Sequence, residues 1–147
     1  MIRKFKKEDA RKVSNLIRKA LVEVNSKDYP PSAIQYLCDE YSPKRLIDAS
    51  KKRAIFVAAE NAKIFGIVGI ENNHVFNLFV NPTFHGIGIG TRLMAHAEKI
   101  VKNRGYSFVE LPSSITADKF YKKLGYKEIE KKRDKNIGEI IILRKEI

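Results

Sequence analysis

The stretch LFVNPTFHGIGIGTRLM, residues 78–94, joins an apolar run to an amphipathic segment through Asn81-Pro82 and three glycines at alternate positions. The apolar run up to Val80 is typical of a strand, and the spacing of apolar residues after Gly90 predicts a helix. A turn of this kind has two explanations. The glycines serve packing alone, or they form a backbone cradle for a ligand that carries phosphate.

The three glycines, Gly86, Gly88 and Gly90, remove side chains at the point where the helix begins. The N–H groups of a helix's first turn have no partner within the helix, and the helix dipole favours an anion there. Glycine also lets a ligand approach the backbone closely and permits positive φ angles. The stretch therefore predicts an anion-binding turn between a strand and a helix.

Two familiar phosphate motifs do not fit the stretch. A P-loop requires Lys and then Ser or Thr after its last glycine, whereas Gly90 is followed by Thr91-Arg92. A dinucleotide fingerprint GxGxxG would need glycine at Thr91 or at Leu93, depending on the starting glycine. Its parallel βαβ surroundings are not expected either, because the strands before the loop have the pattern of an antiparallel meander.

The remaining sequence predicts strands and helices on both sides of this turn. The expected strands are residues 2–5, 54–60, 64–71, 74–80, 107–111, 126–130 and 139–144, and the expected helices are residues 7–24, 32–39, 42–51, 93–101 and 117–124. Short turns between the three strands of residues 54–80, and again between the last two strands, predict antiparallel pairing. The fold class is therefore α/β of the α+β type, with a mixed, mostly antiparallel sheet of about six or seven strands flanked by helices.

Length and composition favour one ordinary globular domain over residues 1–147, with 44% hydrophobic and 31% charged residues. No apolar run approaches the ~20 residues of a membrane span, and the first residues lack the apolar region of a signal peptide. We therefore expect a cytoplasmic protein without a membrane partner. Cys38, the single cysteine, is expected to be buried and inert, and no cluster of metal ligands is apparent.

The formal charge of +12 is the most unusual bulk property. A basic protein attracts polyanions through its long-range field, so nucleic acid is one partner to consider. The basic residues, however, are spread over KFKKED, SKKR, YKK and KKRDK, the aromatic residues stand at core spacings, and no nucleic-acid motif is present. A lysine-coated surface that keeps the protein in solution is the simpler interpretation.

Two segments resemble the GCN5-related N-acetyltransferase (GNAT) family. Residues His85–Gly90 are similar to its pyrophosphate loop, Gln/Arg-x-x-Gly-x-Gly/Ala, with His85 in the place of Gln or Arg. Residues Ser114–Tyr126 resemble its motif Asn-x-x-Ala-x-x-Phe-Tyr-x-x-Leu-Gly-Phe, with Ser114 in the place of Asn. Both segments stand in the family's order. The resemblance concerns motifs from Phe56 to Tyr126 and the order of elements over nearly the whole chain.

The resemblance implies an acyl-CoA N-acyltransferase fold, acetyl-CoA as co-substrate and no metal. The end of the strand would offer backbone groups to the pantetheine arm and the acetyl carbonyl, and the loop would hold the pyrophosphate. The cofactor-binding residues implied are Leu78, Phe79, Val80, His85, Gly86, Ile87, Gly88, Ile89, Gly90, Thr91, Ser114 and Tyr121.

The resemblance also suggests catalytic residues. Tyr121 matches the family's usual general acid, which would protonate a departing thiolate with a conjugate-acid pKa of ~8.5. The alternative is that Tyr121 is a core aromatic residue. Glu110 lies near the position of a catalytic Glu in the ribosomal-protein acetylating branch, one residue out of register, and a one-residue slip turns a strand residue to the opposite face. Glu71 and His74 are alternative bases.

Acceptor specificity in the family comes from the first helices, their connecting loop and the last hairpin. Tyr29 and Tyr36 are expected to wall an acceptor pocket, or simply to pack the helices on the sheet, and Asp28 or Glu23 would steady an ammonium. The expected reaction is transfer of an acetyl group to a primary amine of a small molecule, with an acidic acceptor left open by the basic surface.

Several other functions stay open. A protein or peptide acetyltransferase would need an open groove flanked by Tyr29 and the last hairpin. A basic nucleic-acid-binding module, and an acetyl-CoA sensor without catalysis, are alternatives of another class. Homodimerisation is common in the family and is kept as a hypothesis.

Overall fold

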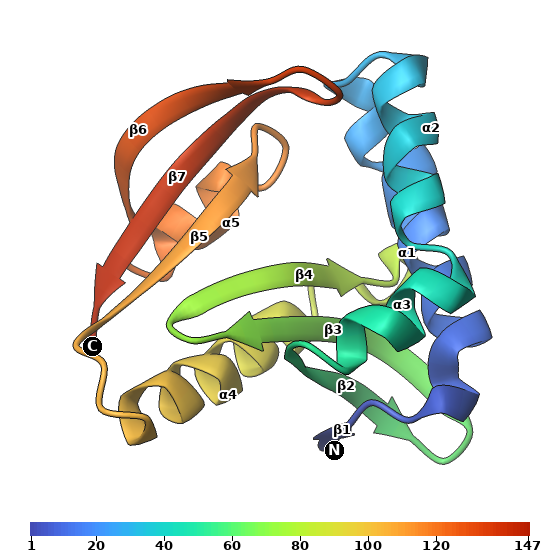
Figure 1. Ribbon diagram of the computed structural model, residues 1–147, viewed down its shortest axis with the longest axis horizontal. Helices are drawn as coiled ribbons and strands as arrows, with labels where there is room; N and C mark the ends of the chain where they lie inside the picture. The colour runs from blue at the N-terminus through green and yellow to red at the C-terminus, as the bar shows by residue number, and fades with distance from the viewer.

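The structure, a computed structural model, describes residues 1–147 (Figure 1). The strands are β1 (Ile2–Lys4), β2 (Ala54–Glu60), β3 (Lys63–Glu71), β4 (His74–Val80), β5 (Phe108–Ser114), β6 (Lys127–Asp134) and β7 (Gly138–Glu146). The helices are α1 (Ala10–Glu23), α2 (Pro31–Glu40), α3 (Pro43–Ser50), α4 (Ile89–Asn103) and α5 (Asp118–Lys123). Every strand and helix expected from the sequence is present, with ends that differ by a few residues.

The strands form one seven-stranded sheet in the order β1-β2-β3-β4-β5-β7-β6. All neighbours are antiparallel except β4 and β5, which run parallel. The mixed, mostly antiparallel sheet flanked by helices is confirmed. The expectation that no parallel βαβ unit surrounds the glycine loop is wrong, because β4, α4 and β5 form one. A strand that follows a helical crossover returns parallel to the strand before it.

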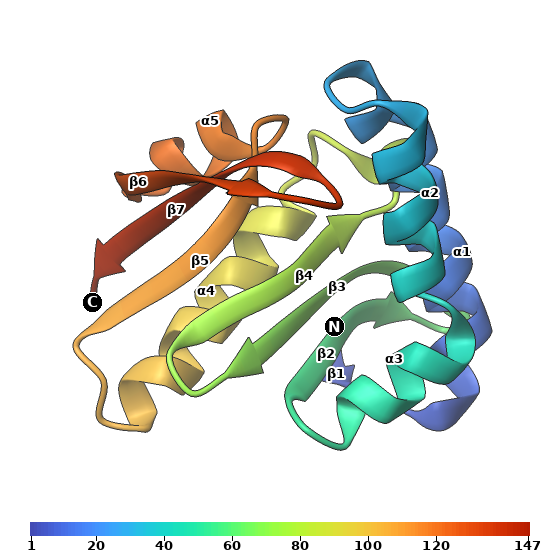
Figure 2. The ribbon, with the colours of Figure 1, turned by 45° about the horizontal axis from the view of Figure 1, so that its top comes forward.

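Helices cover both faces of the sheet (Figures 1 and 2), and a hydrophobic cluster lies on each face. On one face α1, α2 and α3 pack against β2 and β3, and the buried stripe of α1 includes Val13 and Ile17 at helical spacing. On the other face α4 and α5 pack against β3, β5 and β7, with Leu93 at the centre of the contact. Cys38 on α2 is buried and unpaired, as the sequence predicted.

Strand β5 continues to Ser114, whereas the sequence placed its end at Leu111 and gave Pro112 to the approach of the next helix. Pro112 pairs with Ile142 on β7. Glu110 donates its N–H toward β4. Backbone groups alternate sides along a strand, so an N–H at position 112 would also face β4, and proline has none to offer. Pro112 is tolerated because β4 has already separated from β5 there and offers no acceptor.

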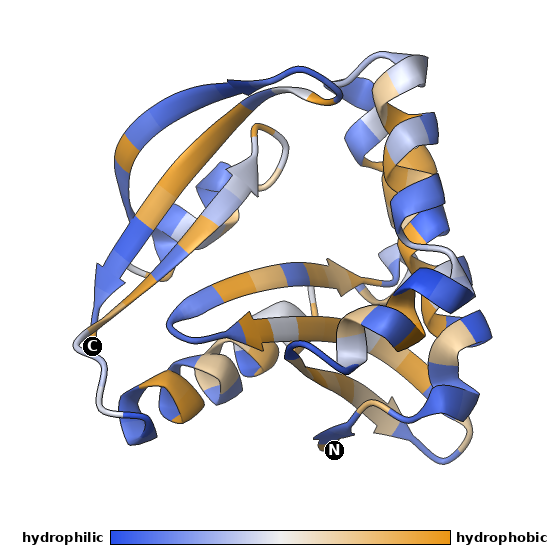
Figure 3. Cartoon of the chain, in the orientation of Figure 1, coloured by the Kyte–Doolittle hydropathy of each residue, from blue (hydrophilic) through white to orange (hydrophobic).

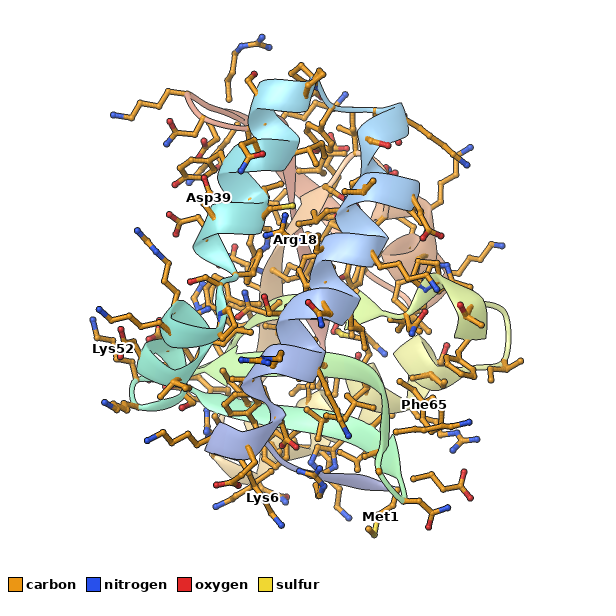
Figure 4. All side chains as sticks on the ribbon, turned by 90° about the vertical axis from the view of Figure 1, so that its right-hand side faces the viewer. Met1, Lys6, Arg18, Asp39, Lys52 and Phe65 are labelled. Atoms are coloured by element: carbon orange, nitrogen blue, oxygen red, sulfur yellow. The ribbon has the colours of Figure 1, made fainter.

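Charged residues occupy the outer surface. Strand β6, at the edge of the sheet, is hydrophilic along most of its length (Figure 3) and exposed, which discourages pairing with another strand edge. Lys6, Arg18, Asp39 and Lys52 are exposed on the side that faces the viewer in Figure 4. None of the helices combines the length and the hydropathy that a membrane span needs.

Asp9 joins β1 to the start of the first helix and is the one buried carboxylate of this region. Arg3 donates to both of its oxygens, at 2.8 and 3.0 Å, and the N–H of Lys6 donates to Oδ2 at 2.8 Å. The hydrogen bonds from Arg3 hold the pKa of Asp9 below its ordinary value of 3.8, against the opposing effect of burial.

We expect Asp9→Asn to lower the free energy of unfolding at pH 7 by about 1.5–3 kcal/mol, because it removes charge-assisted hydrogen bonds from a buried site. Since the folded-state pKa is lowered, this stabilisation is complete above pH 3.8 and disappears as the pH falls through the folded-state value. Urea unfolding of both proteins at pH 7 and under acid conditions measures it. Glu8→Gln, at an exposed neighbouring carboxylate, is the control, and an equal loss in that variant would contradict the account.

Candidate active site

Strands β4 and β5 pair at a single position and then separate. The pair is His74 with Glu110, and beyond it the two strands diverge toward their carboxyl ends (Figure 1). Asn81 donates its N–H to Phe65 on β3. Because backbone groups alternate sides along a strand, the N–H and C=O groups of residues 78 and 80 face the opening. The ring of His85 takes the carbonyl of Val80, so this part of β4 offers both backbone groups of Leu78 and the N–H of Val80 to a ligand between the strands.

A β-bulge lies where β4 leaves β5. Ile67 pairs with Phe79 and Gly69 with Phe76, so Asn77 and the following residue together oppose one residue of β3. Asn77 has φ +61°, in the left-handed region that Asn adopts more readily than most residues. A bulge bends its strand, so the sheet opens at this residue.

The side chain of Asn77 is held on both sides. Arg53 donates to its Oδ1 at 2.9 Å, and its Nδ2 donates to the hydroxyl of Tyr41 at 2.9 Å. The guanidinium of Arg53 also lies over the ring of Phe76, 4.5 Å from the centroid. The bulge is thus anchored to the end of α3 and to the end of α2. The hydroxyl of Tyr41 accepts from Asn77, so its own proton is free to donate elsewhere.

The glycine loop carries a run of unpaired backbone donors. The N–H groups of residues 86–91 donate to no backbone acceptor, and the first helical bond runs from Arg92 N–H to Gly88 O at 3.0 Å. Gly86 and Gly88 have φ +82° and +88°, and a Cβ added to either would meet no atom within 4 Å. Backbone conformation, not packing, therefore requires these two glycines. Packing does matter at Gly90, whose Cβ would lie 3.1 Å from the ring of Phe120.

One cavity of about 840 Å³ extends from this loop, along the opening between β4 and β5, to the turn between β6 and β7. Its walls bring together both segments that the sequence singled out, including the glycine loop, Ser114 and Tyr121. Leu78, Phe79, Val80, His85, Ile89 and Thr91 also line it, whereas Ile87 points away and is exposed. The loop and the second motif, separated by a helix and a strand in the sequence, thus form one site.

Tyr121 lies on α5 and is buried, yet its hydroxyl has no hydrogen-bond partner in the protein and faces the cavity. Burial raises the pKa of Tyr121 well above its ordinary value of 10.0, and the nearby Tyr41 raises it further. The hydroxyl therefore stays protonated at neutral pH and can donate a hydrogen bond into the cavity.

Three further polar side chains shape the cofactor end of the cavity. Ser114 Oγ accepts from Ala117 N–H at 3.2 Å and so caps the approach to α5. The ring of His85 bonds to Val80 O at 2.9 Å, which ties the loop back to the end of β4. Thr116 Oγ1 is buried without a partner in the cavity wall, a polar group that a ligand would satisfy.

Glu110 lies outside the cavity, at the point where β4 and β5 meet. His74 contacts its Oε2 at 3.0 Å and Arg144 donates to its Oε1 at 3.3 Å. One oxygen therefore holds β5 to β4 at their one pair, and the other holds β5 to Arg144 on β7. Glu71 and His74, the other base candidates, do not line the cavity either.

Of the two tyrosines expected to wall an acceptor pocket, Tyr29 lines the cavity and Tyr36 does not. Tyr29 is buried, donates to Glu139 O on β7 at 2.8 Å and accepts from Ile115 N–H at 2.8 Å. It therefore joins the loop before α2 to the last hairpin and closes this end of the cavity. Asp28 and Glu23 are not among the lining residues.

A second, more open depression of about 510 Å³ lies at the end of the sheet where β4 begins. It is lined by basic residues, among them Lys51, Lys52 and Arg104. It holds no group with an obvious catalytic chemistry, so the large cavity is the candidate active site.

Sequence reasoning did not single out four residues of or beside the site: Arg53, Tyr41, Asn77 and Asp134. Asn77 stands in the middle of an apolar strand. It is polar and adopts left-handed backbone more readily than most residues, and this is the one local signal of a bulge there. Arg53 and Tyr41 are distant from Asn77 in the sequence and contact it only in the folded chain.

The family model described as an acetyltransferase (GNAT) domain matches residues 25–146. An uncharacterized N-acetyltransferase of Methanocaldococcus jannaschii is 37% identical over 89 residues, which cover 51% of this chain and 39% of that relative. The chain thus spans well under half the length of this relative.

Two solved structures share the fold. A GCN5-related N-acetyltransferase from Rhodopseudomonas palustris has a TM-score of 0.90 at 19% identity, over 100% of this chain and 95% of that one. The PaiA N-acetyltransferase of Thermoplasma acidophilum, in complex with coenzyme A, has a TM-score of 0.84 at 22% identity, over 100% and 98% of the two chains. At such identities the likeness concerns the fold.

Proposed function

Because the chain belongs to the GNAT acetyltransferase family and is therefore an acyltransferase, we propose that it transfers the acetyl group of acetyl-CoA to a primary amine of a small molecule. The observation that carries this proposal is the single cavity that joins unpaired backbone donors at the glycine loop to the partnerless hydroxyl of Tyr121. A relative of the same fold binds coenzyme A, which supports acetyl-CoA as the co-substrate.

In this proposal the N–H groups of residues 86–91, at the start of α4, hold the pyrophosphate, since the helix dipole favours an anion there. The backbone of Leu78 and Val80 holds the pantetheine arm and orients the thioester carbonyl. No Lys or Arg side chain lines the cavity, so the backbone supplies the donors for the phosphates. Gly86 and Gly88 leave the approach to these donors open.

The thioester supplies an activated acetyl group. The amine nitrogen attacks the carbonyl carbon, the C–N bond forms, the C–S bond breaks, and the sulfur leaves with the electron pair of that bond. Tyr121 donates a hydrogen bond and then a proton to the sulfur. The attacking nitrogen loses one proton to solvent as the amide forms, and Tyr121 takes a proton back from solvent, so the products are the N-acetylated amine and free coenzyme A. The apolar cavity disfavours the ammonium form of the acceptor, whose proton passes to solvent before attack. Glu110 has no part in this proposal, because both of its oxygens are engaged.

A small acceptor is favoured over a peptide by the closure at Tyr29. A peptide acetyltransferase would need an open groove between Tyr29 and the last hairpin. Here the hydroxyl of Tyr29 donates to Glu139 O of that hairpin, a hydrogen bond that bridges the two sides of such a groove.

We expect Gly88→Glu to abolish binding of acetyl-CoA in calorimetric titration, because it places a carboxylate among the donors for the pyrophosphate. The matched control is Gly105→Glu at the other end of α4. Gly105 has a similar φ of +94° and equally open surroundings, so both variants carry the same backbone strain. Equal weakening in both variants, or binding that survives in Gly88→Glu, would contradict the proposed cradle.

We expect Tyr121→Phe to lower kcat by about 100-fold or more, which is the rate enhancement that a general acid typically supplies. Binding of acetyl-CoA should be retained. The thermal stability of the variant should be unchanged or higher, because the lost hydroxyl has no partner in the protein. Tyr126→Phe is the control: its hydroxyl donates to Glu98 at 2.8 Å, so that variant should lose stability and keep its kcat. A Tyr121→Phe variant with kcat within about threefold of the parent protein would remove Tyr121 from the mechanism.

A further inference from the structure

Almost none of the protein's charged side chains line the cavity. The chain has 29 Lys and Arg residues, yet none of them is among the residues that line the cavity. Asp134, the last residue of β6, is the one acidic residue in the walls. An acidic acceptor would find no cation there, so the basic surface does not extend to the acceptor end.

The carboxylate of Asp134 stabilises the turn that follows β6. Its Oδ1 accepts the N–H groups of Asn136 and Ile137, at 2.8 and 3.1 Å. A carboxylate oxygen that already takes two backbone donors has less capacity for an ammonium. The cavity walls therefore offer no fully free carboxylate to a second positive charge on an acceptor.

Apart from Asp134 and the uncharged Asn25, the acceptor end of the cavity is apolar. Val24, Leu37, Tyr29, Ile137 and Ile140 line it, from the two sides of the opening. Burying apolar surface against such walls is favourable, whereas burying an unpaired ammonium is costly.

Other carboxylates lie outside the walls. Asp28, Glu139 and Asp118 are near enough to Tyr29 to raise the pKa of its hydroxyl, after the larger effect of burial. Asp118 contacts Lys122 at 3.1 Å and Glu139 contacts Lys131 at 3.9 Å, which leaves Asp28 as the unpaired one. Asp28 is exposed to solvent and does not line the cavity, so it offers no buried partner to a second ammonium.

From this distribution we infer that the acceptor is a primary amine on an apolar body with no second charged group, and not a polyamine, an aminoglycoside or an acidic amine. The inference rests on the proposed function and specifies the class of its acceptor. The reacting amine reaches the thioester beside Tyr121, and the apolar body occupies the space between Leu37, Tyr29 and Ile140.

The test is a set of kcat/KM values for acetyl transfer from acetyl-CoA to matched amines. From butylamine to hexylamine we expect a rise of about fourfold for each methylene buried in the cavity. Hexylamine should exceed 1,6-diaminohexane, which has the same length and a second ammonium, by about 10-fold or more. Spermidine, kanamycin and glutamate should be poorer still.

Two substitutions in β7 test whether the cavity wall causes the preference for an amine with an apolar body. Ile140→Asp puts a free carboxylate in the wall, and should lower kcat/KM for hexylamine by about 10-fold and narrow the gap to the diamine. Ile142→Asp is the matched control, because Ile142 is on the same face of β7, is similarly half-buried and does not line the cavity. Acetyl-CoA titration of both variants checks that each one folds and keeps the cofactor site.

A parent protein that acetylates the diamine, spermidine, kanamycin or glutamate better than hexylamine would overturn the inferred acceptor class while leaving the proposed acetyltransferase function standing. An equal effect of the two β7 variants on hexylamine would also overturn it. Binding of acetyl-CoA without transfer to any of these amines would contradict the proposed function itself.

Discussion

The site depends on one constraint, the separation of two neighbouring strands after a single pair. His74 and Glu110 hold β4 to β5 at that pair, with Arg144 on the second carboxylate oxygen. Beyond it the bulge at Asn77 bends β4 away, and the left-handed φ of Asn77 is secured by Arg53 and Tyr41 through the two ends of its amide. A sheet that kept its ladder here would have no unpaired strand groups and no central cavity.

The same separation determines how an anion can be held. Where β4 ends, the chain turns through glycines at positive φ into α4, and leaves the N–H groups of residues 86–91 without acceptors in the protein. The strong positive charge of the molecule is displayed elsewhere, on β6, on the outer helices and in the basic depression around Lys51 and Arg104. A site built from backbone donors binds phosphate by geometry, and keeps its interior apolar enough to favour a neutral amine.

Much of the fold was predictable because its patterns are local. Helical spacing in α1 and α4, short turns around β2, β3 and β4, and glycines at the ends of helices each predict their element directly. The parallel pairing of β4 with β5 was not predicted, since it depends on a crossover and not on a turn. The extension of β5 through Pro112 was missed because a proline inside a strand is allowed only where the neighbouring strand has left, which the local sequence does not reveal.

In the candidate site, too, the features with a local pattern were predictable and those that depend on distant contacts were not. Both motifs were found from residue types at fixed spacing, and the cavity brings the glycine loop and Tyr121 together. Glu110 was considered as a base from its position in the sequence, but its role at the strand pair depends on His74 and Arg144, which are distant in sequence. Tyr36 and Tyr29 looked equivalent in the sequence, and only the packing of α2 puts one in the wall and the other outside it. Asp134, at the end of β6, and Tyr41, at the end of α2, reach the cavity from positions that carry no motif.

The central claim is that the opening between β4 and β5 holds acetyl-CoA through backbone N–H groups. The most direct measurement is an NMR titration of the backbone amides with acetyl-CoA and, in parallel, with S-acetylpantetheine, which lacks the pyrophosphate. The account predicts that acetyl-CoA shifts the amides of residues 86–91 together with those of Leu78 and Val80, and that S-acetylpantetheine shifts only the two strand amides strongly. Shifts centred on Lys51, Lys52 and Arg104, with the glycine loop unaffected, would contradict it.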